Sequence, residues 1–232
     1  MNRTANYIKN RLSLRHPQAD SLRILMQLAD ELALQKPNGD EDFLEKELDK
    51  VKAEFPTCED FERTFPSLCF ALATGVGKTR LAGAFVAYLY LEKGIKNFFI
   101  LAPNLTIYNK LIEDFSNPSH PKYVFQGLGE FVNNPPNIIT GDNYQEIPRL
   151  KLFSSDLNIN VFNISKINAE TRGGATPKIR SMSEYLGESY FNYLSGLEDL
   201  VMIMDESHHY RAARGMDVLN QLNPILGLEL TA

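Results

Sequence analysis

One segment, residues 72–79, restricts the possible folds of this chain more than any other. It reads Leu-Ala-Thr-Gly-Val-Gly-Lys-Thr and lies between the apolar run Ser67–Ala73 and the alanine-rich run Arg80–Leu91. The first run predicts a buried strand and the second a helix. A glycine-rich loop between a strand and a helix points backbone N–H groups at an anion, and the positive end of the helix dipole faces the same anion. We therefore expect a phosphate-binding loop (P-loop) at residues 72–79.

The residue types in the P-loop each have a chemical reason. Gly75 and Gly77 allow backbone angles that other residues avoid, and they let the backbone approach phosphate oxygens closely. Lys78 would reach the β and γ phosphates, and the hydroxyl of Thr79 would bind Mg²⁺. The general pattern has a glycine at the position of Leu72, and the alternative interpretation is a glycine turn with an incidental lysine. The expected nucleotide-binding residues here are Thr74, Gly75, Val76, Gly77, Lys78, Thr79 and Arg80.

Further apolar runs follow, and helical patterns alternate with them. We expect strands at Asn97–Ala102, Asn137–Thr140, Ile159–Ile164, Leu200–Met204 and Leu226–Leu230, and a helix at Leu105–Phe115. Alternating strands and helices predict a parallel sheet with helices on both faces. The expected fold class is therefore α/β, a three-layer sandwich with a mostly parallel central sheet.

Residues 1–60 have a different, polar and helical pattern. Apolar residues at helical spacing predict a helix from Asp20 to Leu34, capped by Asp20 or Ser21, and a surface helix from Asp40 to Phe55. We expect residues 1–60 to form a helical extension and residues 61–232 to form the nucleotide-binding lobe.

A P-loop needs a partner carboxylate from a neighbouring strand, and Asp205 and Glu206 follow the apolar run Leu200–Met204. Ligands of open α/β sheets bind at the carboxyl ends of the strands. Asp205 would complete the Mg²⁺ shell, and Glu206 would orient and deprotonate the attacking water. The local alternative is two solvated acids at the end of a strand. We expect no zinc site at His208 and His209, because no cysteine or third histidine stands at ligand spacing.

Composition narrows the class of protein further. The net charge of −5, from 24 basic and 29 acidic residues, argues against coating of nucleic acid by bulk charge. Two cysteines, no export signal and no apolar run of about 20 residues predict a cytoplasmic protein without a membrane span. The most basic neighbourhood surrounds Thr171–Pro177, which is either a phosphate-contacting loop or a solvated surface loop.

These motifs resemble those of superfamily 2 helicases. Residues 205–208 (Asp-Glu-Ser-His) resemble the DExH box, and residues 73–79 resemble motif I, including the departure at Leu72. Residues 102–105 resemble motif Ia, which contacts the nucleic-acid backbone, and residues 230–232 resemble the opening of motif III, which couples hydrolysis to strand movement. The resemblance implies a RecA-like P-loop lobe that uses ATP and Mg²⁺. By the same resemblance the coupling residues are His208 and Thr231.

The amino-acid sequences of four stretches resemble those of the helicase-like Res subunit of type III restriction systems. They are residues 14–18, 98–115, 139–144 and 162–168. This resemblance implies ATP hydrolysis during communication along double-stranded DNA, a nuclease domain towards the C-terminus and a DNA-modification (methyltransferase) subunit as partner. Gln18 matches the family's adenine-reading glutamine, and the alternative is a helix-start glutamine that faces solvent.

Four residues are candidates for contacts with the DNA backbone. They are Asn104, Thr106, Ser165 and Lys166. Helix N-termini and hydroxyls suit phosphate oxygens without reading bases, and the alternative for each residue is a capping or turn role.

The resemblance covers only part of the family's length. The chain stops inside motif III, so the second lobe and its arginines are missing, and we find no nuclease signature. Because an arginine finger contributes about 10³- to 10⁵-fold in rate, we expect weak turnover from this piece alone. Two other functions fit the same residues. One is an RNA helicase or remodeler lobe, and the other is a non-catalytic nucleotide-binding adaptor if the gene ends at residue 232.

Overall fold

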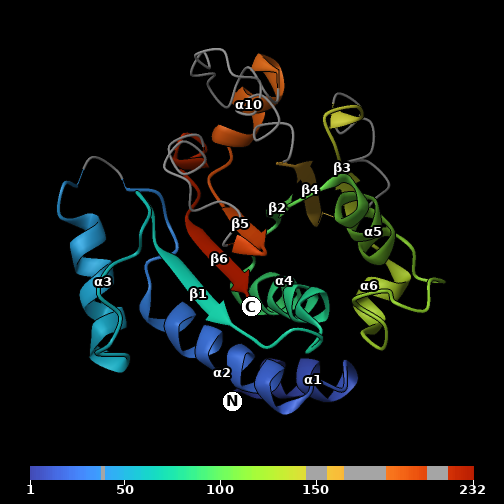
Figure 1. Ribbon diagram of the computed structural model, residues 1–232, viewed down its shortest axis with the longest axis horizontal. Coiled ribbons are helices and arrows are strands. Elements are labelled where there is room, and N and C mark those ends of the chain that lie inside the picture. Colours follow the sequence, from blue (N-terminus) through green and yellow to red (C-terminus); the bar gives the residue numbers. More distant parts are fainter. Residues whose placement is uncertain (38–39, 145–155, 165–186, 208–218) are drawn as a thin grey trace.

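The computed structural model describes residues 1–37, 40–144, 156–164, 187–207 and 219–232. In these residues the chain forms one six-stranded sheet with the order β1-β6-β5-β2-β4-β3, and all neighbouring strands are parallel (Figure 1). The strands are β1 (Ser67–Ala71), β2 (Asn97–Ala102), β3 (Asn137–Ile139), β4 (Asn158–Asn163), β5 (Leu200–Asp205) and β6 (Leu226–Thr231). The predicted α/β class and parallel sheet are confirmed.

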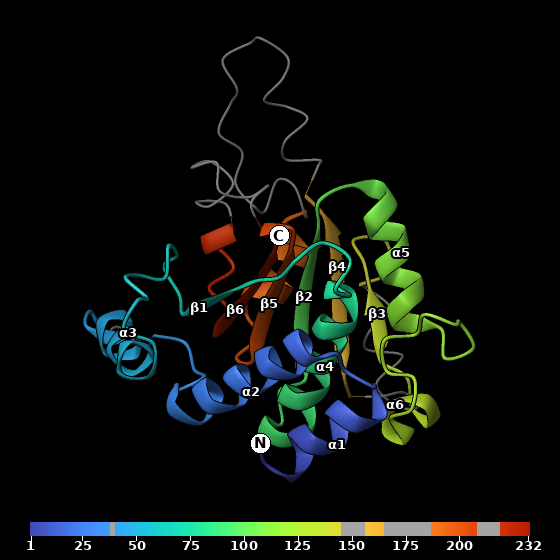
Figure 2. The same cartoon turned by 60° about the horizontal axis from the view of Figure 1, so that its bottom comes forward.

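Helices connect and cover these strands. They are α1 (Arg3–Arg11), α2 (His16–Glu31), α3 (Phe43–Glu54), α4 (Lys78–Lys93), α5 (Leu105–Ser116), α6 (Gly129–Asn133) and α10 (Glu188–Ser195). Figure 2 shows α1, α2 and α4 together against one face of the sheet. None of the helices in the described ranges is long and apolar enough to cross a bilayer.

Alternating side chains of the central strand β2 enter two separate apolar cores. Phe98 and Ile100 pack with α4, whereas Phe99 and Leu101 pack with Tyr190 of α10. Successive residues of a strand point to opposite faces, so an uninterrupted apolar strand needs cover on both sides. The result is the three-layer arrangement expected from the sequence.

The N-terminal helices are part of the first core. Ile8 of α1 and Leu22 of α2 are buried in the same cluster as Phe85 of α4. The predicted start of the helix at Asp20–Leu34 is wrong, because α2 begins at His16 and not at Asp20 or Ser21. Proline is well tolerated in the first turn of a helix, so the Pro17 that follows His16 favours this earlier start. The division at residue 60 stays a prediction.

Four polar side chains form a ladder across the amino ends of the strands. The amide of Asn137 donates to Asn158 (3.0 Å), that of Asn158 donates to Asn97 (3.0 Å), and that of Asn97 donates to Asp199 (2.6 Å). Asn137 and Asn97 are the residues opposite Asn158 in the two strand pairs that β4 makes. This asparagine ladder therefore satisfies the buried amide of Asn158 and its half-buried neighbours, and it favours the observed register of β2, β3 and β4.

Candidate functional site

The P-loop leaves the carboxyl end of β1 and runs into α4. Gly75 (φ +80°) and Gly77 (φ +96°) both have left-handed backbone angles, which favour glycine. A Cβ atom on Gly77 would also lie 2.9 Å from Nε2 of Gln18. At the base of the loop, the N–H of Leu72 donates to the carbonyl of Thr231 at the end of β6 (2.9 Å). The loop therefore has the strand, glycine and helix context that phosphate binding needs.

Lys78 and Glu206 meet at the carboxyl edge of the sheet. Nζ of Lys78 lies 2.9 Å from Oε1 of Glu206, and the two side chains are 10% and 29% exposed. Glu206 has φ +54°, an angle that non-glycine residues adopt rarely and often at functional sites. The structure thus brings together the cation and the carboxylate that the sequence placed 128 positions apart (206 minus 78). Their catalytic roles stay predictions.

Asp205 ends β5 beside this ion pair. Burial raises the pKa of its carboxyl group and the negative charge of Glu206 raises it further, while Lys78 and Lys110 lower it. Within the described residues no three His, Cys, Asp or Glu side chains cluster as a metal site. Thr79 and Asp205 could hold Mg²⁺ only together with phosphate oxygens and water, which is how proteins usually bind this ion.

Gln18 lies behind the P-loop and is only 2% exposed. Its Oε1 accepts the backbone N–H of Arg15 (2.8 Å), and its Nε2 donates to the carbonyl of Gly77 (2.9 Å). The solvent-facing alternative is therefore wrong. Its role in reading adenine stays a prediction.

Two arginines donate hydrogen bonds to backbone carbonyl groups in and near the P-loop. Nη1 of Arg15 donates to the carbonyl of Gly75 (3.2 Å), and Nη1 of Arg80 donates to the carbonyl of Leu12 (2.8 Å). The sequence pattern did not reveal Arg15, because its partner is a backbone group 60 positions away.

A cavity of about 300 Å³ opens between α2 and the P-loop. Its described lining residues are Ser13, Arg15, Gln18, Gly75, Val76, Gly77 and Arg80. These residues carry two guanidinium groups and no carboxylate, in a chain of net charge −5. The local charge therefore favours an anionic ligand.

The predicted DNA-contacting and coupling residues are only partly described. Asn104 caps α5, where its side chain accepts the N–H of Ile107 (2.9 Å), and Thr106 is exposed in the first turn of that helix. Capping, the alternative considered for Asn104, is thus present, and DNA contact is not tested. Thr231 is the last residue of β6. Outside the described residues lie Ser165, Lys166, His208 and the loop 171–177.

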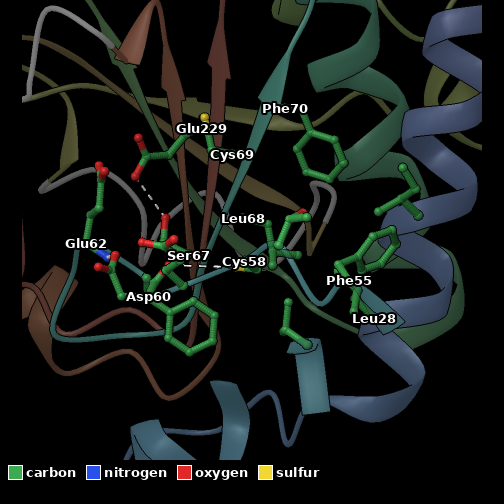
Figure 3. A pocket seen from close by; sticks show the side chains of 15 residues that line it. Leu28, Phe55, Cys58, Asp60, Glu62, Ser67, Leu68, Cys69, Phe70 and Glu229 are labelled. Atoms are coloured by element: carbon green, nitrogen blue, oxygen red, sulfur yellow. Dashed lines mark hydrogen bonds between the residues drawn. The ribbon is translucent and has the colours of Figure 1, made fainter. Parts of the chain in front are cut away.

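A second cavity, of about 500 Å³, lies between β1, α2 and α3 (Figure 3). Its walls carry the thiols of Cys58 and Cys69, which are not in a disulfide, and the carboxylates of Asp60 and Glu62. None of the site residues expected from the sequence is among its described lining residues. It is therefore separate from the P-loop site.

Comparisons with known proteins place this chain beside restriction enzymes. The family model described as type III restriction enzyme, res subunit, matches residues 11–232. The probable type III restriction-modification enzyme HindVIP Res subunit of Haemophilus influenzae (strain ATCC 51907 / DSM 11121 / KW20 / Rd) is 30% identical over 148 residues. That stretch is 62% of this chain and 25% of the relative, so the chain matches a minor part of that protein. Among solved structures, FlhF complexed with GTP/Mg²⁺ aligns with 98% of this chain and 88% of that one. At 12% identity and a TM-score of 0.25, this alignment carries no argument.

Proposed function

Because the chain belongs to the family of type III restriction enzyme Res subunits, we propose that it is the ATP-binding motor lobe of a DNA-dependent ATPase and translocase. Joined to its second lobe, it would hydrolyse ATP to ADP and phosphate. The observation that carries this proposal is the 2.9 Å contact between Lys78 and Glu206 beside the N-terminus of α4. A cation, a carboxylate and a helix N-terminus at one edge are the groups that a triphosphate with Mg²⁺ requires.

Each residue of the site has a defined task in this proposal. Lys78 exchanges Glu206 for the β and γ phosphates, which releases the Glu206 carboxylate to orient the attacking water. Thr79 and Asp205 would hold Mg²⁺, which supplies charge neutralisation of the phosphates when bound. The cavity between α2 and the P-loop would take part of the nucleotide, with Gln18 in its wall beside Arg15 and Arg80.

The DNA part of the proposal rests on the family and on the predicted helix-start residues. Asn104 and Thr106 would contact phosphates of double-stranded DNA, as would Ser165 and Lys166, and a DNA-modification subunit would be the partner. Such contacts are blind to sequence and weaken steeply as salt increases. Stimulation of ATP hydrolysis by duplex DNA but not by RNA, measured on the complete protein, tests this part. Stimulation by RNA alone would favour the RNA helicase alternative.

The nucleotide site is tested by calorimetry with Mg-ATP on the 232-residue chain. We expect Lys78→Ala to weaken binding about 100-fold or more, because it removes a charge-assisted contact to two phosphates. Lys122→Ala, which changes an exposed loop lysine, is the matched control and should bind like the wild type. Equal affinity of the wild type and the Lys78 variant would rule the proposal out.

A further inference from the structure

Two side chains at the start of α2 hold the P-loop by its carbonyl oxygens. Arg15 donates to the carbonyl of Gly75 (3.2 Å), and Gln18 donates to the carbonyl of Gly77 (2.9 Å). The other end of the Gln18 amide accepts the backbone N–H of Arg15 (2.8 Å). Arg15 and Gln18 are therefore linked to each other as well as to the loop.

Holding a carbonyl group also sets the direction of the next N–H group. In a trans peptide the C=O of one residue and the N–H of the following residue point in opposite directions, and the protein has no cis peptide bonds among its described residues. With the Gly75 carbonyl directed at Arg15, the N–H of Val76 points away from Arg15 and donates to the carbonyl of Ala73 within the loop (3.3 Å). The Gly77 carbonyl accepts from Gln18 (2.9 Å) and also from the N–H of Leu81 in the first turn of α4 (3.2 Å). The N–H of Lys78 points away from both donors.

The N–H groups of Val76 and Lys78 belong to the set that a P-loop uses to surround a phosphate, and the N–H of Val76 would exchange the Ala73 carbonyl for a phosphate oxygen. The flanking residues Gly75 and Gly77 have left-handed backbone angles and the widest conformational freedom of any residue type. Peptide planes next to glycines reorient easily unless something holds them. A donor behind each carbonyl lowers the entropy lost when the loop closes around phosphate.

We propose that Arg15 and Gln18 are positioning residues that orient the P-loop amides towards the triphosphate, whichever base the nucleotide carries. This inference rests on the proposed nucleotide site. It differs from the prediction that Gln18 recognises adenine. In that prediction Gln18 contacts only the base, and Arg15 has no role.

A base-free ligand separates the two roles. Binding of Mg-ATP, Mg-GTP and Mg-tripolyphosphate is measured by calorimetry on the wild type, Arg15→Met and Gln18→Leu. We expect each variant to lose about 10-fold in affinity for all three ligands, the effect of roughly one hydrogen bond. Arg15→Lys keeps a donor within reach of the carbonyl and should recover most of the loss.

Matched controls lie on the same helix. Arg23 donates to Gln27 (2.6 Å) on the exposed side of α2, so Arg23→Met and Gln27→Leu should bind all three ligands like the wild type. Because Arg15 is exposed, its variants carry the test even if Gln18→Leu fails to fold.

The outcomes distinguish this inference from the function it rests on. A loss confined to Mg-ATP, with tripolyphosphate binding unchanged, overturns the positioning role and leaves the nucleotide site standing. Failure of Arg15→Lys to recover affinity also contradicts it. A wild type that binds none of the three ligands removes the proposed function itself, and the inference with it.

Discussion

The two ends of the central sheet differ in how their polar groups are paired. At the amino end, Asn97, Asn137, Asn158 and Asp199 bond to one another in a continuous ladder. At the carboxyl end the groups are a lysine–glutamate ion pair, a buried aspartate of raised pKa and a glycine loop with left-handed backbone angles. The amino end is complete in itself, whereas the carboxyl end concentrates charge and strain.

This difference indicates which end contributes stability and which end receives a ligand. Amides and a carboxylate that already bond to one another gain little from a bound partner. Charged groups held close together around a buried carboxyl of raised pKa, here Asp205, are typical of functional sites, where a ligand relieves the cost. Substitutions at the two ends should therefore change different measurements.

The largest effect is expected from Asn158→Ala, at the middle of the ladder. The change removes hydrogen bonds to both Asn137 and Asn97 in a buried place, which should cost about 2–4 kcal/mol of the free energy of unfolding. Urea denaturation measures the loss, with the exposed Asn109→Ala as control. Nucleotide affinity of the folded variant should stay that of the wild type. A loss of stability no larger than the control's would show that the ladder contributes nothing.

A smaller, opposite effect is expected from Asp205→Asn. Because the pKa of Asp205 is raised in the folded state, its charge opposes folding at neutral pH, and removing it should raise Tm by roughly 2–4 °C, which corresponds to about 1 kcal/mol. The gain should be complete above the folded-state pKa. It should shrink as the pH falls through that value and vanish below the ordinary aspartate pKa of about 3.9.

Thermal unfolding of Asp205→Asn at a series of pH values, without nucleotide or Mg²⁺, gives this profile. Asp49→Asn, which changes an exposed aspartate on α3, is the control and should show no such gain. A gain that persists unchanged at low pH would mean that the buried charge is not its cause.

The smallest change in a folding or binding free energy is expected from Glu206→Gln. The substitution removes the carboxylate that competes with phosphate for Lys78, so affinity for Mg-ATP should rise about two- to fivefold, the scale of a partly exposed ion pair. Calorimetry on the chain measures the affinity, and single-turnover hydrolysis in the complete protein should be lost. Weaker binding by the variant would show that Glu206 supports the nucleotide instead of competing with it.

Local sequence patterns predicted the strands that lead to the carboxyl edge of the sheet well. Strands β1, β2 and β5 lie within two residues of their expected bounds, because continuous apolar runs of this length are typical of strands in a parallel sheet. The prediction that the first of these runs is buried was wrong, because β1 is an edge strand and its Cys69 and Ala71 are exposed. The predicted start of α2 was wrong because Asp20 and Ser21 are good caps, yet Pro17 and Gln18 already support helix upstream of them. The five-residue α6 was missed because it is too short to show a helical period.

The sequence patterns could not predict contacts between residues that are far apart in the chain. Arg15 bonds to a carbonyl, and every residue except its neighbours could supply that acceptor, so no residue type signals the contact. The asparagines of the ladder are separated by tens of positions, and their shared property becomes visible only in retrospect. Each stands at the amino end of an apolar strand, so the parallel arrangement aligns them.

The position of β6 sets the distance between the two walls of the site, which are the P-loop after β1 and the acidic pair at the end of β5. It lies between β1, which leads into the P-loop, and β5, which ends in the acidic pair. Neighbouring strands are about 4.8 Å apart, so this one intervening strand holds the walls at a separation of about 10 Å. Its last residue, Thr231, is bonded to the root of the loop, and a force pulling on the backbone there would reach both walls at the same moment.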